Sequence, residues 1–423
     1  MAEARPTNAA ELERLRRRTV ATLVAGVALG STGHIAAVTV ATIVATHISG
    51  GAKAWSGAPT ATVVLGAAAG AIGLSWVMVR RGRRFGLTAG YVVSVLGAIL
   101  ATAAVVMLSL PLLLIGTVLI GFGNASNQLS RYTAADLAPP DRRASAIGLV
   151  VWGATIGAVA GPNLVAPAGK VALALGLPEL SGPYLVPIVF VGAAALLSFL
   201  LLRPDPYVLA DASSRHDMEG GDRSVAVSLA SVIARPSVPV AIVALVTGQV
   251  VMVLIMTMTP LHMADHGHDL AAVGLVISGH TFGMFGLSPI SGRLTDRYGS
   301  VPVILAGLGV VAIASILAAA APPEGGAVLF LALFLLGYGW NLGYVAGSAL
   351  LTHGLSLAER TRVQGLTDGL IWSSAAVASL GSGVVLAYAG YAILGLLGAA
   401  LVVVPMLLVI ARRSAVAGSR GAS

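Results

Sequence analysis

Long apolar stretches alternate with short polar segments along almost the whole chain. Each stretch is about 20 residues long, the length at which an α-helix crosses the roughly 30 Å hydrocarbon core of a bilayer. The pattern therefore predicts an all-α integral membrane protein. The twelve predicted membrane-spanning helices are 20–46, 57–79, 87–108, 110–133, 144–166, 184–203, 236–260, 271–291, 301–320, 327–351, 363–389 and 391–411.

The composition agrees with a membrane location. Hydrophobic residues make up 57% of the chain and charged residues only 10%, whereas about 25% of the residues in a soluble domain are charged. The net charge of +8 does not call for a nucleic-acid partner, because arginines beside membrane helices fix topology and contact anionic lipid headgroups. The partner that the composition predicts is the lipid bilayer.

The distribution of Lys and Arg predicts the orientation. If both termini are cytoplasmic, all of these residues except Lys53 and Lys170 fall in the tails or on cytoplasmic loops, and this bias is the one that sets membrane topology. The first 18 residues are too polar, and the following apolar stretch too long, for a cleaved signal peptide. We expect a multi-pass protein of the cell membrane with both ends in the cytoplasm.

One long hydrophilic interval, residues 203–236, separates two groups of six predicted helices. The two groups resemble each other, because "WVMVRRGRRFG" (76–86) follows the second helix as "GRLTDRYG" (292–299) follows the eighth. The predicted organisation is a cytoplasmic tail, a six-helix bundle, a cytoplasmic linker, a second six-helix bundle and a cytoplasmic tail, over residues 1–19, 20–203, 204–235, 236–411 and 412–423.

Two six-helix repeats, a central linker and a basic glycine turn after helices 2 and 8 resemble the major facilitator superfamily of transporters. The inner-loop motif of that family is matched in its first part by Gly292, Asp296, Arg297 and Gly299. The resemblance implies secondary active transport by alternating access, with a gating role for these four residues. A carboxylate at this rim can accept hydrogen bonds from a neighbouring helix N-terminus and pair with an arginine. Topology-fixing charge on a tight loop is the alternative.

The first half keeps only the basic end of the same motif. Arg80, Gly82, Arg83 and Arg84 match it, but no acid lies beside them in the sequence, so topology-fixing charge is the favoured interpretation. The fifth predicted helix carries Gly148, Gly157, Gly161 and Pro162 at spacings similar to an antiporter motif of this superfamily. Close helix packing or helix bending, without export, is the favoured explanation of these glycines.

The seventh and eighth predicted helices carry methionine and histidine pairs at helical spacing. Met252 and Met256 share one face of the seventh helix, and His280 and Met284 share one face of the eighth. Met252 and His280 both lie near the predicted bilayer midplane. Thioether sulfur and imidazole bind copper without leaving an uncompensated charge in lipid. These patterns resemble the CcoA-like (CalT) copper-uptake branch of the superfamily. The resemblance implies that these four residues bind copper as the transported substrate, and no resident cofactor is expected.

The segment "LHMADHGHD" lies between these two helices on the predicted outer side. Its soft and titratable side chains would collect a metal ion at the mouth of the path: His262, Met263, His266 and His268. Polar residues that cap the eighth helix, with Asp269 at its start, are the alternative explanation.

Few polar residues lie deep in the predicted helices. Each is costly in lipid unless it faces the protein interior, so each is a candidate for the substrate cavity: His34, Asn124, Asn127, Gln128, Gln249 and Asn341. For the amides, a structural hydrogen bond between helices is an equal alternative. Asp136 and Asp368 fall near the predicted inner interface, and no Asp or Glu lies in the middle of a predicted helix.

Enzymatic chemistry finds no support in the sequence. No glycine loop with a lysine is present to cradle phosphates, and no nucleophile, base and orienting acid are grouped together. Our first hypothesis is a copper-uptake transporter, monomeric in the membrane. The alternative is a proton-linked transporter of a small organic solute, either a flavin-like vitamin that is imported or a drug or metabolite that is exported. A hypothesis of another class is a metal sensor or assembly factor that does not transport.

Overall fold

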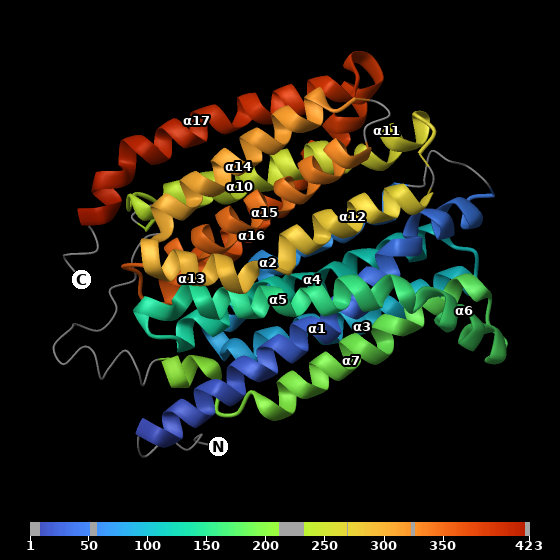
Figure 1. Ribbon diagram of the computed structural model, residues 1–423. Helices are drawn as coiled ribbons and strands as arrows, with labels where there is room; N and C mark the ends of the chain where they lie inside the picture. Colours follow the sequence, from blue (N-terminus) through green and yellow to red (C-terminus); the bar gives the residue numbers. More distant parts are fainter. Residues whose placement is uncertain (1–8, 51–56, 211–231, 269, 323–325, 419–423) are drawn as a thin grey trace. The chain divides into compact units, whose positions relative to one another are not determined.

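The computed structural model describes residues 9–50, 57–210, 232–268, 270–322 and 326–418 (Figure 1). Over these ranges the ordered elements are helices, and none is a strand. Twelve spans among the described residues are long and apolar enough to cross a membrane. The prediction of an all-α protein with twelve membrane-spanning helices is confirmed.

In the first half of the sequence, the described residues form seven α-helices and two short 3₁₀ helices. They are α1 (Ala9–Ile48), α2 (Ala58–Arg81), α3 (Arg83–Val106), α4 (Leu110–Leu137), η2 (Pro140–Arg142), α5 (Arg143–Asn163), α6 (Val165–Ala174), η3 (Glu179–Ser181) and α7 (Gly182–Leu201). The second half forms α10 (Ser237–Met256), α11 (Thr259–Asp265), α12 (Leu270–Phe285), α13 (Ser288–Tyr298), α14 (Ser300–Ala320), α15 (Gly326–Leu350), α16 (Leu357–Ala389) and α17 (Tyr391–Gly418).

Several helices extend beyond their apolar stretches. The first begins at Ala9, where the hydrophobic pattern places a tail, and Glu13 pairs with Arg17 one turn later at 2.8 Å. The eleventh predicted span begins at Leu357, because Ser356 and Glu359 form a reciprocal capping box at its N-terminus. Hydrophobicity does not detect these polar turns, since they lie outside the apolar core of each helix.

The eighth predicted span is broken into two helices. α12 ends at Phe285 and α13 begins at Ser288, with a proline in the first turn of α13 that has no N–H to donate. The side-chain amide of Asn341 on α15 donates to the carbonyl oxygen of Met284 and to the hydroxyl of Ser288, each at 2.6 Å. The acceptors at the break are thus hydrogen-bonded by a side chain from a neighbouring helix.

Contacts between Cα atoms divide the chain into two compact units. The first comprises residues 1–139, 153–225 and 364–372, and the second comprises 140–152, 226–363 and 373–423. The start of α5 therefore packs with helices of the second half of the sequence, and part of α16 packs with helices of the first half. The predicted linker, residues 204–235, and the predicted tails fall partly outside the described residues.

Small residues allow close helix packing inside each unit. In the first unit, a Cβ atom added to Gly116 on α4 would lie 2.8 Å from both the Ala101 nitrogen and the Gly97 oxygen on α3. In the second, a Cβ added to Gly307 on α14 would lie 2.8 Å from the Gly343 nitrogen on α15. Only glycine permits these approaches, which bring backbones together where lipid offers no hydrophobic drive for association.

Candidate functional site

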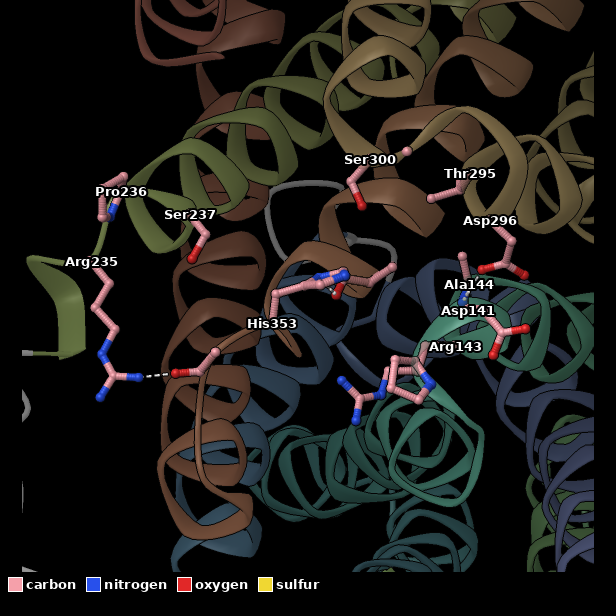
Figure 2. A pocket seen from close by; sticks show the side chains of 14 residues that line it. Asp141, Arg143, Ala144, Arg235, Pro236, Ser237, Thr295, Asp296, Ser300 and His353 are labelled. Carbon is pink, nitrogen blue, oxygen red and sulfur yellow. Dashed lines mark hydrogen bonds between the residues drawn. The ribbon is translucent and has the colours of Figure 1, made fainter. Parts of the chain in front are cut away.

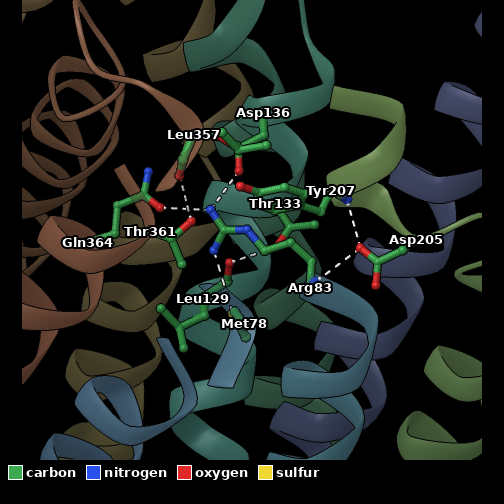
Figure 3. A network of polar contacts seen from close by, with 10 residues as sticks. All are labelled: Met78, Arg83, Leu129, Thr133, Asp136, Asp205, Tyr207, Leu357, Thr361 and Gln364. Carbon is green, nitrogen blue, oxygen red and sulfur yellow. Dashed lines mark hydrogen bonds and ion pairs between the residues drawn. The ribbon is translucent and has the colours of Figure 1, made fainter. Parts of the chain in front are cut away.

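A buried ion pair lies at the start of α3, in the first unit (Figure 3). The Arg83 guanidinium donates through Nη2 to Oδ2 of Asp136 at 2.6 Å and to Oε1 of Gln364 at 3.0 Å. Both charged side chains are almost fully buried. The sequence places no acid beside Arg83, and its acidic partner, Asp136, lies on α4. A topology-fixing charge would lie in solvent, so that interpretation of Arg83 is wrong.

A second buried ion pair joins α4 to α16 within the same unit. Nη2 of Arg131 donates to Oδ1 of Asp368 at 2.6 Å, and the Tyr132 hydroxyl donates to the same oxygen at 3.3 Å. The other carboxylate oxygen of Asp368 is buried and has no hydrogen-bond partner in the described part of the chain. The sequence offers one signal for this pair, since opposite charges occur inside two predicted spans.

The predicted gating residues lie in the second unit, on α13 and at the turn that follows. Oδ1 and Oδ2 of Asp296 accept hydrogen bonds from the backbone N–H groups of Ala144 and Ser145, at 3.0 and 2.9 Å. A Cβ atom on Gly292 would lie 2.8 Å from Cα of Ser145, so glycine is required there. The carboxylate thus rests on the N-terminus of α5, where the helix dipole favours negative charge. Its role as a gate stays a prediction.

The four predicted copper ligands lie on two helices that both pack against α15. Met252 is buried and Met256 half-buried on α10, while Met284 is half-buried on α12. His280 is fully buried, and its Nδ1 lies 2.8 Å from the carbonyl oxygen of Leu333 on α15. Its Nε2 is buried without a hydrogen-bond partner among the described residues. Metal binding by these residues stays a prediction.

The predicted metal-collecting segment is partly helical, because α11 occupies Thr259–Asp265. The His262 ring stacks on the Tyr391 ring with centroids 4.2 Å apart, and it lies 4.4 Å from the His266 ring. Met263 is fully buried. In the described part of the chain, no three His, Asp or Glu side chains gather in a group that could hold a metal ion. Asp269 lies outside the described residues, and the role of His268 stays a prediction.

An aromatic group that the sequence analysis did not single out lies beside the predicted metal ligands. The Trp340 ring stacks on Tyr344 at 4.4 Å, and Phe285 meets it edge-on at 6.0 Å. Nε1 of Trp340 donates to the side-chain oxygen of Gln249 on α10 at 2.9 Å. Trp340 and Tyr344 are one helical turn apart in a chain with only 5% aromatic residues, which is the signal that could have identified them.

Among the predicted cavity residues of the first unit, Asn127 forms hydrogen bonds to two other helices. Oδ1 of Asn127 accepts a hydrogen bond from the Tyr91 hydroxyl at 2.9 Å, and its amide nitrogen donates to the Ser31 hydroxyl at 3.4 Å. Asn124 is buried, Gln128 is half-buried, and Nδ1 of His34 is buried without a partner among the described residues. Asn341 has a structural role at the break in the eighth span, and Gln249 holds Trp340.

Comparison with known proteins decides the family. The family model described as "Major Facilitator Superfamily" matches residues 20–378 and, in a second match, residues 240–422. The chain belongs to this superfamily. Its members are transporters, so this chain is a multi-pass membrane transporter.

Two relatives in sequence and one solved structure are similar to this chain over most of its length. The chain is 38% identical over 384 residues to the uncharacterized MFS-type transporter YdeG of Bacillus subtilis. This alignment covers 91% of this chain and 89% of the relative. It is 30% identical to the riboflavin transporter RfnT of Brucella anthropi, with 83% and 85% covered. In fold it is similar to the proton:xylose symporter XylE, with a TM-score of 0.72 at 15% identity over 93% and 95% of the two chains.

Proposed function

We propose that this superfamily member transports a small organic solute with a planar conjugated ring, of the flavin class, by alternating access and with proton coupling. The observation that carries the proposal is the aromatic group on α15 and α12 with its polar neighbour Gln249. The similarity to a riboflavin transporter over 83% of the chain supports the same substrate class.

The aromatic group has the chemistry that a flavin ring requires. Offset or stacked aromatic pairs gain about 0.5–1.5 kcal/mol beyond their buried area, and a planar solute can join such a stack. The side-chain oxygen of Gln249 is used by Trp340, which leaves its amide nitrogen to donate to a ring carbonyl of the solute. Ring stacking and one directed hydrogen bond would together select a planar polar ring.

Asp368 supplies a proton carrier. Its side chain is buried, one oxygen is held by Arg131 and Tyr132, and the other oxygen has no partner among the described residues. A buried carboxylate is tolerated while it is paired, and a proton on the unpartnered oxygen would weaken the ion pair with Arg131. Transport coupled to protons would use this change in pairing between α4 and α16.

Flux of radioactive riboflavin into proteoliposomes of the purified protein, driven by a proton gradient, tests the substrate class. We expect uptake by the parent, a loss of at least tenfold in Trp340→Leu, and a smaller loss in Trp340→Phe, which keeps a ring but not the bond to Gln249. Trp76→Leu is the matched control, because Trp76 is 54% exposed on α2. Absence of riboflavin flux, or equal flux in Trp340→Leu and the parent, would overturn the proposal.

The same proteoliposomes test the coupling. We expect Asp368→Asn to lose accumulation against a gradient while retaining exchange of labelled for unlabelled solute. Asp136→Asn is the control, since it also removes the acid of a buried ion pair. Proton-driven accumulation that survives in Asp368→Asn would remove this residue as the proton carrier.

Copper uptake is the second candidate, and one observation favours it. The buried Nε2 of His280 has no partner in the described residues, and a metal ion is one ligand that would satisfy it. Uptake of radioactive copper under reducing conditions tests this, with Met252→Ala, Met256→Ala, His280→Ala and Met284→Ala at equal membrane abundance. Copper uptake that collapses in these variants, without riboflavin flux, would put copper first.

A further inference from the structure

A pocket of about 560 Å³ lies in the second unit, around the N-termini of three helices (Figure 2). α5 begins at Arg143, α10 at Ser237 and α14 at Ser300, and all three residues line the pocket. The first N–H groups of a helix have no acceptor within the helix, and the helix dipole adds positive potential at the same end. The N-termini of α10 and α14 therefore add positive potential to the pocket, whereas the N-terminus of α5 is covered by the Asp296 carboxylate.

Two buried hydroxyl groups face this pocket. Ser237 is 6% exposed and Ser300 is 1% exposed, and both side chains are drawn among the residues that surround the hollow in Figure 2. Neither hydroxyl has a hydrogen-bond partner within the described ranges of the chain, whereas several other buried serine hydroxyls donate to the backbone of their own helix, as Ser315 does to Val311. Each hydroxyl is thus available to a ligand inside the pocket.

The charges around the pocket are mixed, but the negative ones are engaged or lie in solvent. Asp296 accepts hydrogen bonds from the first turn of α5, and Asp141 is largely exposed. Arg143 donates to the carbonyl oxygen of Thr352 at 3.1 Å, and Arg235 donates to Glu359 and to the carbonyl oxygen of Gly354. His353 completes the lining. The guanidinium groups of Arg143 and Arg235 thus bring positive charge to the lining of the pocket.

The first unit shows what occupies the equivalent place. Gly82 precedes α3 with φ 90° and ψ 165°, and Gly299 precedes α14 with φ 89° and ψ 159°. At the first turn the Asp205 carboxylate accepts hydrogen bonds from the N–H groups of Arg83 and Arg84, each at 3.1 Å. The N-terminus of α3 thus holds an anion from its own chain, whereas the N-terminus of α14 opens on the pocket.

We infer that this pocket binds the phosphate group of a ligand. The hydroxyls and backbone N–H groups of Ser237 and Ser300 would hydrogen-bond to the phosphate oxygens, with Arg143 and Arg235 supplying positive charge. A free phosphate compound and an anionic lipid headgroup share this chemistry. The inference does not depend on the transported substrate, because none of these residues belongs to the aromatic group.

Thermal unfolding of the purified full-length protein tests the site with inorganic phosphate as the probe. A ligand that binds only the folded state raises the unfolding midpoint as its concentration rises. We expect phosphate to do so relative to chloride at equal ionic strength, and the double variant Ser237→Ala with Ser300→Ala to need at least tenfold more phosphate for the same rise. The matched control is Ser315→Ala with Ser382→Ala, whose hydroxyls bond within their own helices.

A second arm distinguishes the sources of phosphate. The same proteins in nanodiscs of phosphatidylglycerol or phosphatidylcholine, without free phosphate, report on the lipid headgroup. Stabilisation by phosphatidylglycerol that is lost in the pocket variant, without any effect of inorganic phosphate, would assign the site to lipid. The inference would be overturned if neither phosphate nor phosphatidylglycerol stabilised the parent. It would also be overturned if each stabilised the pocket variant as much as the parent.

Discussion

The two glycine turns at Gly82 and Gly299 share a backbone and differ in what fills the space beside it. Their φ and ψ angles agree within a few degrees, and positive φ values of this size favour glycine. In the first unit Arg83 follows the glycine and is buried against Asp136, with Asp205 over the helix N-terminus. In the second unit Ser300 follows, and a pocket opens.

This difference shows that two turns can share one backbone conformation and still carry side chains with different interactions. Both turns need glycine, because the conformation is fixed by the direct passage from one helix to the next. The side chains that follow the glycine are not fixed by this backbone. A buried ion pair lies beside Gly82, whereas hydrogen-bond donors that line a pocket lie beside Gly299. The predictions below test whether the two turns differ in this way, from the largest effect to the smallest.

Arg83→Ala is expected to destabilise the protein by about 3–5 kcal/mol, because it leaves Asp136 buried without its partner. Ser300→Ala, at the equivalent position, is expected to cost less than about 0.5 kcal/mol, since its hydroxyl has no partner within the described chain. Thermal unfolding in one detergent and at one scan rate measures both. Similar losses in the two variants would contradict the difference between the turns.

Gly82→Ala and Gly299→Ala put an alanine into two turns that have nearly the same positive-φ backbone. An alanine at either position is forced into a strained conformation, which costs about 1–3 kcal/mol. At Gly82 the added Cβ would also collide with the Asp205 carboxylate. We expect Gly82→Ala to lower the unfolding midpoint by more than backbone strain alone accounts for. The double variant Gly82→Ala with Asp205→Ala should recover the part of the loss that the clash causes, and no recovery would refute the clash.

Asp205→Asn is expected to destabilise by about 1 kcal/mol, because the neutral amide interacts less with the α3 N-terminus than a carboxylate does. Asp296→Asn removes the same kind of interaction at α5 and should cost a similar amount. If Asp296 also gates transport, only its variant will change the turnover rate by more than the loss of folded protein explains. Proteoliposome flux, normalised to folded protein, separates the two effects.

Ser300→Asp gives the second turn a carboxylate, as the first turn has. An acidic residue in the first turn of a helix stabilises by about 0.3–1 kcal/mol. We expect a small rise in the unfolding midpoint without phosphate and a loss of the further rise that phosphate causes in the parent. Ser300→Asn is the neutral control. Undiminished stabilisation of Ser300→Asp by phosphate would show that the anion does not lie at this helix.

The sequence alone determined the twelve spans, for one physical reason, whereas the superfamily was indicated by the resemblance of the repeats and of the inner-loop motif. An apolar stretch of about 20 residues can satisfy its backbone in lipid only as a helix, so composition and length suffice without any knowledge of neighbours. The glycine turn after α13 was readable for a similar reason, since a local backbone conformation leaves its mark on adjacent residues. Counting along two helices predicted a similar depth for Met252 and His280.

Only the tertiary structure decided which polar groups meet. Arg83 and Asp136, and Arg131 and Asp368, are partners that lie 53 and 237 residues apart. The break between α12 and α13 depends on Asn341 from α15, and the aromatic group depends on Gln249 from α10. Hydrophobic patterning fixes the length and depth of a helix, but its rotation and its neighbours depend on packing against other helices, which no local pattern records.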